Sequence, residues 1–118
     1  MANELSVSAR ISFSKSNARV SRSDTELIDV TGSEFTHQVQ VIGTTEEQIE
    51  QGADVGTPGY LWIKNLDATN YVEIGSTTGV YDIKLKAGEI ALYRHNSATI
   101  YAKANTASCR VEYILVED

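Results

Sequence analysis

The chain has 118 residues, of which 42% are hydrophobic and 22% are charged, and its formal net charge is −6. That length suits one domain, and this share of apolar residues is enough for a core without disulfides or metal. The negative charge disfavours binding to nucleic-acid phosphates, and no apolar run reaches the ~18 residues of a membrane span. We therefore expect a single domain over residues 1–118 that binds neither nucleic acid nor a membrane.

The N-terminal part combines a strand pattern with a basic, serine-rich stretch. From Leu5 to Phe13 apolar residues alternate with three serines and Arg10, which predicts a strand with one buried face. Ser14 to Asp24 is polar and reads as a loop, so residues 1–24 are expected to form a strand plus a mobile basic arm. Residues 25–56 contain seven acidic residues and no Lys or Arg. Arg19 and Arg22 of the arm are therefore expected to contact acidic surface on another copy or on a host particle.

The next segments predict two strands and a helical turn. Leu27 to Val30 is a short apolar stretch, and apolar residues alternate with polar ones from Phe35 to Val41. Thr45 and Gln48 match a capping box, and Gly52 would end the helix. We expect one or two helical turns at 45–51.

The second half repeats short apolar segments at intervals of roughly ten residues, with turn residues between them. Gaps this short require antiparallel neighbours. The pattern predicts an all-β, antiparallel β-sandwich of eight or nine strands. A jelly-roll topology is preferred, and an immunoglobulin-like sandwich is the alternative.

Period-two alternation divides these segments into an inner and an outer set. The expected core residues are Leu61, Ile63, Ile74, Ile83, Leu92 and Val111. The same alternation places aromatic side chains on the opposite side: Tyr60, Trp62, Tyr71, Tyr93 and Tyr101. Aromatic residues are enriched at subunit interfaces, so this set predicts an interface. Cover by a segment of the same chain and a carbohydrate-stacking platform are the alternatives.

No catalytic, cofactor-binding or metal-binding residue is predicted. Asn65, Asp67 and Asn70 resemble part of a calcium loop, but such residues more often stabilise a tight turn. His37 lies in phase with apolar neighbours, which favours a partly buried or sheet-edge histidine over a metal ligand. Cys109 opens a strand, where a small buried side chain is expected. Its solitary thiol fits a reducing compartment.

The second half of the chain resembles small proteins encoded by tailed bacteriophages. The resemblance lies in the stretch from Asn65 to Gly75, in Lys84 to Ile90, in Tyr101 to Ala104 and in the ending from Val111 to Val116. These relatives are generally regarded as virion-associated structural components. The resemblance implies a non-enzymatic β-sandwich subunit on a phage particle, made in the host cytoplasm and located in the virion.

The expected function is that of a capsid decoration or accessory protein that acts by protein–protein assembly without a cofactor. Its expected partners are copies of itself, with a trimer as one expected state, and other virion proteins such as major capsid or tail proteins. A tail- or fibre-associated module that binds a carbohydrate or receptor is the alternative.

Overall fold

The computed structural model describes residues 3–118 and is built from β-strands. Within these residues no helix has the length and apolar character needed to cross a membrane. The chain divides into two compact units, Met1–Thr31 and Gly32–Asp118. The strands are β1 (Leu5–Lys15), β2 (Ala18–Ile28), β3 (Phe35–Ile42), β4 (Glu47–Gln48), β5 (Pro58–Asn65), β6 (Val72–Gly75), β7 (Ile83–Leu85), β8 (Ile90–Arg94), β9 (Tyr101–Ala104) and β10 (Cys109–Glu117).

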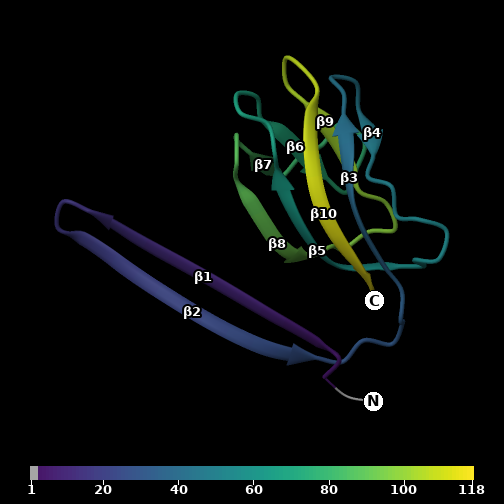
Figure 1. Cartoon of the computed structure of the whole chain (residues 1–118), viewed down its shortest axis with the longest axis horizontal. Helices are drawn as coiled ribbons and strands as arrows, with labels where there is room; N and C mark the ends of the chain where they lie inside the picture. The colour runs from purple at the N-terminus through teal and green to yellow at the C-terminus, as the bar shows by residue number, and fades with distance from the viewer. Residues whose placement is uncertain (1–2) are drawn as a thin grey trace. The chain divides into compact units, whose positions relative to one another are not determined.

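The second unit is a sandwich of two four-stranded antiparallel sheets (Figure 1). Sheet I has the order β3-β10-β5-β8, and sheet II has the order β4-β9-β6-β7. The strand pairs are nested along the sequence: the first strand of the unit pairs with the last, and so on inwards, as β3 with β10, β4 with β9, β5 with β8 and β6 with β7. Successive pairs alternate between the sheets, which is the arrangement of a jelly roll. The predicted fold class is confirmed, with eight strands in the sandwich.

The core lies between the two sheets and is formed by alternate residues of their strands. Most of the predicted core is confirmed, because Leu61, Ile63, Ile74 and Val111 have no exposed surface, and Ile83 packs against them. Leu92 was expected in the core but lies opposite Trp62, on the outer side of sheet I. Its neighbour Tyr93 pairs with the buried Leu61 and faces inward instead. The prediction therefore had the phase of β8 reversed.

The predicted helical turn at 45–51 is wrong. Glu47 and Gln48 form β4, which pairs with Ala102 and Tyr101 of β9. The Ile49 side chain is buried, and its backbone N–H donates to the carbonyl of Ile100 at 2.8 Å. Pairing with β9 and burial of Ile49 thus override the local capping signal, which is worth about 1 kcal/mol.

The first unit is a long β-hairpin (Figure 1). β1 and β2 pair in register from Leu5 opposite Ile28 to Lys15 opposite Ala18, joined by a two-residue turn. The strand predicted from Leu5 is confirmed, but its predicted buried face is wrong, because Ile11 and Phe13 are 66% and 50% exposed. The loop predicted for Ser14 to Asp24 is also wrong, since this stretch turns and forms most of β2.

Candidate functional site

The outer face of sheet I is the most distinctive surface of the sandwich. Four of its apolar side chains are at least half exposed, namely Phe35, Val39 and Val41 of β3 and Ile90 of β8. The register places them on the same side as the partly buried Tyr60, Trp62, Leu92, Ile114 and Val116. Monomeric proteins rarely leave so continuous an apolar surface open to water. This face is therefore the candidate binding surface.

Direct cross-strand pairs form rows across this face. Ile114 of β10 lies opposite both His37 and Trp62, and Trp62 lies opposite Leu92, which makes an apolar row that ends at His37. In the neighbouring row Glu112 lies opposite Val39 and Lys64. The four exposed apolar side chains thus lie on the edge strands β3 and β8, and the central strands carry Arg110, Glu112 and Lys64 on the same face.

Several charged groups of the face bind one another or stack on its rings. The Nε2 atom of His37 lies 2.9 Å from a carboxylate oxygen of Glu112. The guanidinium of Arg94 donates to Asp118 at 2.7 Å and lies 4.8 Å from the centre of the Tyr60 ring. The partner Asp118 raises the pKa of Arg94 further above its already high value.

The orientation of β3 explains why its apolar side faces outward. On the other side of the strand, Gln38 donates to the Tyr113 hydroxyl at 2.5 Å. Gln40 donates to the carbonyl of Gln48 at 3.0 Å and accepts from the N–H of Glu50 at 2.9 Å. The Gln40 amide thus satisfies backbone groups beside β4, which pairs over only two residues. The polar side of β3 is therefore needed inside, and Phe35, Val39 and Val41 are exposed.

The structure divides the five predicted interface aromatics among three places. Tyr60 and Trp62 lie on the outer face of sheet I, whereas Tyr71 and Tyr101 lie on the outer side of sheet II. Tyr93 faces the core. The Tyr71 ring lies 4.1 Å from the Lys84 ammonium, which covers one side of it. The single aromatic face that the alternation predicts is not formed. Sequence reasoning also missed the apolar contribution of β3, whose only signal was the alternation from Phe35 to Val41.

Arg19 and Arg22 lie on opposite faces of the N-terminal hairpin. Arg19 is opposite Ser14 on a serine-rich face, and Arg22 is opposite Ile11 on an apolar face. Both residues are exposed, and Arg22 lies 3.5 Å from Asp24 on its own strand. One surface therefore cannot engage both arginines through the same face of the hairpin.

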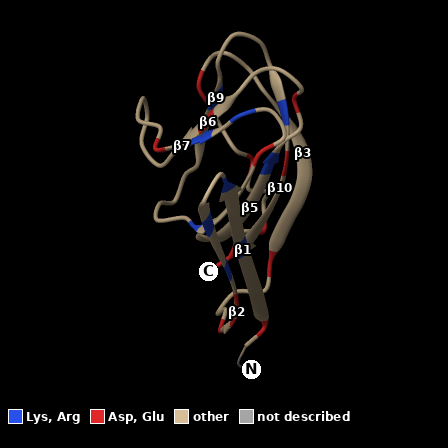
Figure 2. Cartoon of the chain, turned by 90° about the vertical axis from the view of Figure 1, so that its left-hand side faces the viewer, with Lys and Arg blue, Asp and Glu red and all other residues tan. Residues whose placement is uncertain are grey.

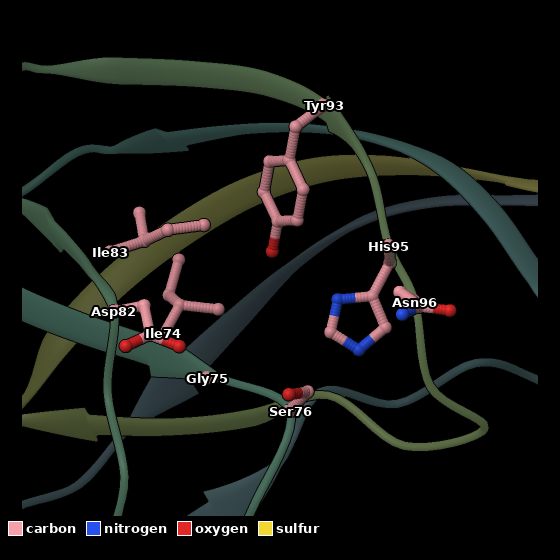
Figure 3. Close-up of a pocket in the computed structure, with 8 residues that line it drawn as sticks. All are labelled: Ile74, Gly75, Ser76, Asp82, Ile83, Tyr93, His95 and Asn96. Carbon is pink, nitrogen blue, oxygen red and sulfur yellow. The ribbon is translucent and has the colours of Figure 1, made fainter.

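A small cavity of about 120 Å³ lies between Ile74, Ile83, Tyr93 and His95 (Figure 3). The Tyr93 ring points into it, and the Tyr93 hydroxyl is a buried side-chain oxygen that has no hydrogen-bond partner among the described residues. Burial raises the pKa of Tyr93 to about 12. The cavity is smaller than the roughly 300–1,000 Å³ of most small-molecule sites.

The other residues singled out from the sequence have structural contacts. His95 is buried, and its Nε2 donates to the carbonyl of Thr99 at 2.6 Å. Cys109 is buried at the start of β10, as predicted, and burial raises its thiol pKa. His37 lies on β3, an edge strand of sheet I, also as predicted. Within residues 3–118 no group of three potential metal ligands occurs.

The segment that resembles a calcium loop is a tight turn. The Asn65 amide is buried and donates to the carbonyls of Asn70 and Leu85, while its oxygen accepts from the N–H of Asp67. The Asp67 carboxylate accepts from the N–H groups of Asn70 and Thr69, which lowers its pKa. These bonds confirm the predicted turn chemistry.

Comparisons with protein-family models, with curated protein sequences and with solved structures find no match to this chain.

Proposed function

We propose that this protein is a non-enzymatic structural subunit of a tailed-phage virion, a capsid decoration or accessory protein that binds other virion proteins through the outer face of sheet I. The observation that carries the proposal is the apolar surface formed by Phe35, Val39, Val41, Ile90 and their partly buried neighbours. Continuous exposed apolar patches mark protein–protein interaction sites. The phage setting rests on the sequence resemblance of the second half of the chain.

The scaffold fits this role. The jelly roll occurs in viral capsid proteins but also in lectins and cupins. The fold is therefore compatible with an assembly role by analogy, but it does not distinguish that role from ligand binding. The side chains most suited to catalysis have structural contacts instead: His95 donates to a backbone carbonyl, and Cys109 is buried with a raised pKa. A raised pKa reduces the thiolate form that would act as a nucleophile.

The alternative of a carbohydrate- or receptor-binding module has less support. It depends on aromatic rings grouped on one face, and the five predicted rings are divided between the two sheets and the core. Of the two rings on sheet I, Tyr60 stacks against Arg94.

The proposal is tested by co-sedimentation of the purified protein with intact tailed-phage particles that lack it. Val39→Asp places a charge on the outer face of sheet I, and Val80→Asp is a matched control because the two valines are 51% and 50% exposed. We expect Val39→Asp to weaken particle binding about tenfold or more and Val80→Asp to leave it unchanged. Equal binding by both variants, or no binding by the wild type, would contradict the proposal.

A further inference from the structure

The N-terminal hairpin has an apolar face that its own two strands do not cover. In a two-stranded ribbon, alternate residues and their direct cross-strand partners share a face. Eight of the twelve residues on one face are apolar: Leu5, Val7, Ala9, Ile11, Phe13, Ala18, Val20 and Ile28. Ile11, Phe13 and Val20 are between 50% and 66% exposed. Isolated hairpins are marginally stable in water, so this face requires a partner.

The opposite face of the hairpin suits water. It consists of Ser6, Ser8, Arg10, Ser12, Ser14, Arg19, Ser21, Ser23, Thr25 and Leu27. The hydroxyls of Ser8 and Thr25 form a cross-strand hydrogen bond of 2.8 Å on this side. The ribbon is therefore amphipathic, and only one of its faces is built for packing.

Along the hairpin, acidic residues lie toward the open end and basic residues toward the turn (Figure 2), and the register shows the same order for the charges of the apolar face. Near the open end Glu26 lies opposite Val7, and Asp24 lies opposite Ala9. Toward the turn Arg22 lies opposite Ile11, and the last pair includes Lys15. The face is thus acidic toward one end and basic toward the other.

We propose that this face binds the same face of a second copy of the chain, with the two hairpins antiparallel. The two-fold axis runs parallel to the cross-strand hydrogen bonds and passes between the Ala9–Asp24 pair and the Ile11–Arg22 pair. It stacks β1 on the partner's β1 and β2 on the partner's β2, with the strands running in opposite directions. Asp24 then lies opposite the partner's Arg22, and this contact occurs twice. The same symmetry sets the small Ala9 opposite the partner's Ile11.

The charge order selects this orientation. With the hairpins parallel, the acidic ends of both copies would lie together, and so would the basic ends, which places like charges close to one another. Antiparallel packing brings each acidic end to a basic end while it buries Phe13 and Ile11. Self-complementarity of one patch is what a two-fold interface requires.

The size of the face sets the expected affinity. Each strand has 11 residues, so the ribbon is about 36 Å long, but it is only two strands wide. Its face is therefore small compared with the roughly 800 Å² per partner of a stable interface. We therefore expect a micromolar dimer. The dimer goes beyond the proposed function, because it uses the hairpin and not the outer face of sheet I.

Sedimentation velocity of the full chain between about 1 and 200 μM tests the dimer, since that range brackets micromolar dissociation constants. The wild type should shift from monomer to dimer across it. Phe13→Asp should weaken the dimer about tenfold or more, and Ser12→Asp, which adds the same charge to the opposite face of the same strand, should not. A wild type that stays monomeric, or equal behaviour of the two variants, would overturn the proposal.

Two charge-reversal variants, measured alone and mixed, test the contact between Arg22 of one chain and Asp24 of the other. The result does not rest on whether a single variant folds stably. Arg22→Asp alone and Asp24→Arg alone should each dimerise about tenfold more weakly, because like charges then meet across the axis. An equimolar mixture of the two should regain the wild-type affinity, as each chain supplies the charge the other needs. No recovery on mixing would overturn the pairing. Val39→Asp should dimerise normally, which separates this proposal from the proposed function.

Discussion

Gly75 lies at the end of β6, where the chain passes close to the segment around Val80. A Cβ atom at Gly75 would overlap the backbone carbonyl oxygen of Val80 and also contact Tyr81. Backbone cannot move aside as a flexible side chain can, so this position requires glycine.

We expect Gly75→Ala to lower the free energy of unfolding by about 2–4 kcal/mol, as overpacking against backbone does. Urea unfolding followed by circular dichroism measures this loss. Gly43→Ala is the control, because a Cβ atom at Gly43 would meet its nearest neighbour at an ordinary contact distance of 3.5 Å. A loss at Gly75 no greater than at Gly43 would show that the two segments are not in close contact.

Removing the buried hydroxyl of Tyr93 is expected not to destabilise the fold, in contrast to Gly75→Ala. Because that oxygen has no partner among the described residues, its removal gives up no protein hydrogen bond and relieves a desolvation cost. Tyr93→Phe should therefore leave the free energy of unfolding unchanged or raise it by about 1 kcal/mol. A decrease of more than about 1 kcal/mol on urea unfolding would mean that the hydroxyl has a partner.

Glu117 joins the end of β10 to two loops and predicts a dependence of stability on pH. Its carboxylate accepts from the N–H of Gly56 at 2.6 Å and from that of Ser33 at 3.1 Å. The bond to Gly56 is the main cause of its lowered pKa, and backbone groups of Glu34 and Ser33 contribute. A carboxyl group with a lowered pKa stabilises the fold above its unfolded pKa, and that stabilisation is lost as pH falls through the folded pKa.

Glu117→Gln should therefore unfold more easily than the wild type at about pH 7, and the difference should shrink as pH falls below about 4. Urea unfolding at a series of pH values measures both effects. Asp54→Asn, which changes an exposed acid in the same unit as Glu117, is the control and should leave the profile unchanged. A difference between Glu117→Gln and wild type that stays constant across the series would contradict the assigned role of the charge.

At the scale of the strand, alternation predicted where strands form more reliably than which side they bury. In β5 the apolar side is the buried side, and Leu61 and Ile63 were placed correctly. In β3 the apolar side is exposed because Gln38 and Gln40 are required inside. Which side of a strand faces the core depends on hydrogen bonds to distant segments, and the local sequence does not contain that information.

β8 offers a direct test of the observed phase. Leu61→Ala on β5 should lower the free energy of unfolding by about 2–5 kcal/mol, because Leu61 is fully buried. Leu92→Ala should cost less than about 1 kcal/mol, since Leu92 lies on the outer side of sheet I. Urea unfolding of the two variants compares them, and equal losses would mean that Leu92 faces the core.

At the scale of the whole molecule, segment spacing was enough to predict an antiparallel β-sandwich, because short gaps require antiparallel neighbours. The same spacing fits a jelly roll and an immunoglobulin-like sandwich, so the choice between them needed the strand order of the structure. The candidate surface could be predicted only in part. Tyr60 and Trp62 lie on it as expected, but Tyr71, Tyr93 and Tyr101 do not. Assigning residues to one face requires knowing which strands share a sheet, and β3 and β10 are far apart in the sequence.

The proposed function requires that the outer face of sheet I becomes covered when the protein binds a virion. Trp62 is the single tryptophan of the chain and lies on this face, so its solvent contact reports the cover directly. Replacing it with 5-hydroxytryptophan allows selective excitation in the presence of particle proteins, and acrylamide quenching then measures its accessibility. We expect measurable quenching of the partly buried Trp62 in the free protein and a several-fold decrease when the protein co-sediments with phage particles. Equal quenching in the free and particle-bound protein would contradict the proposed function.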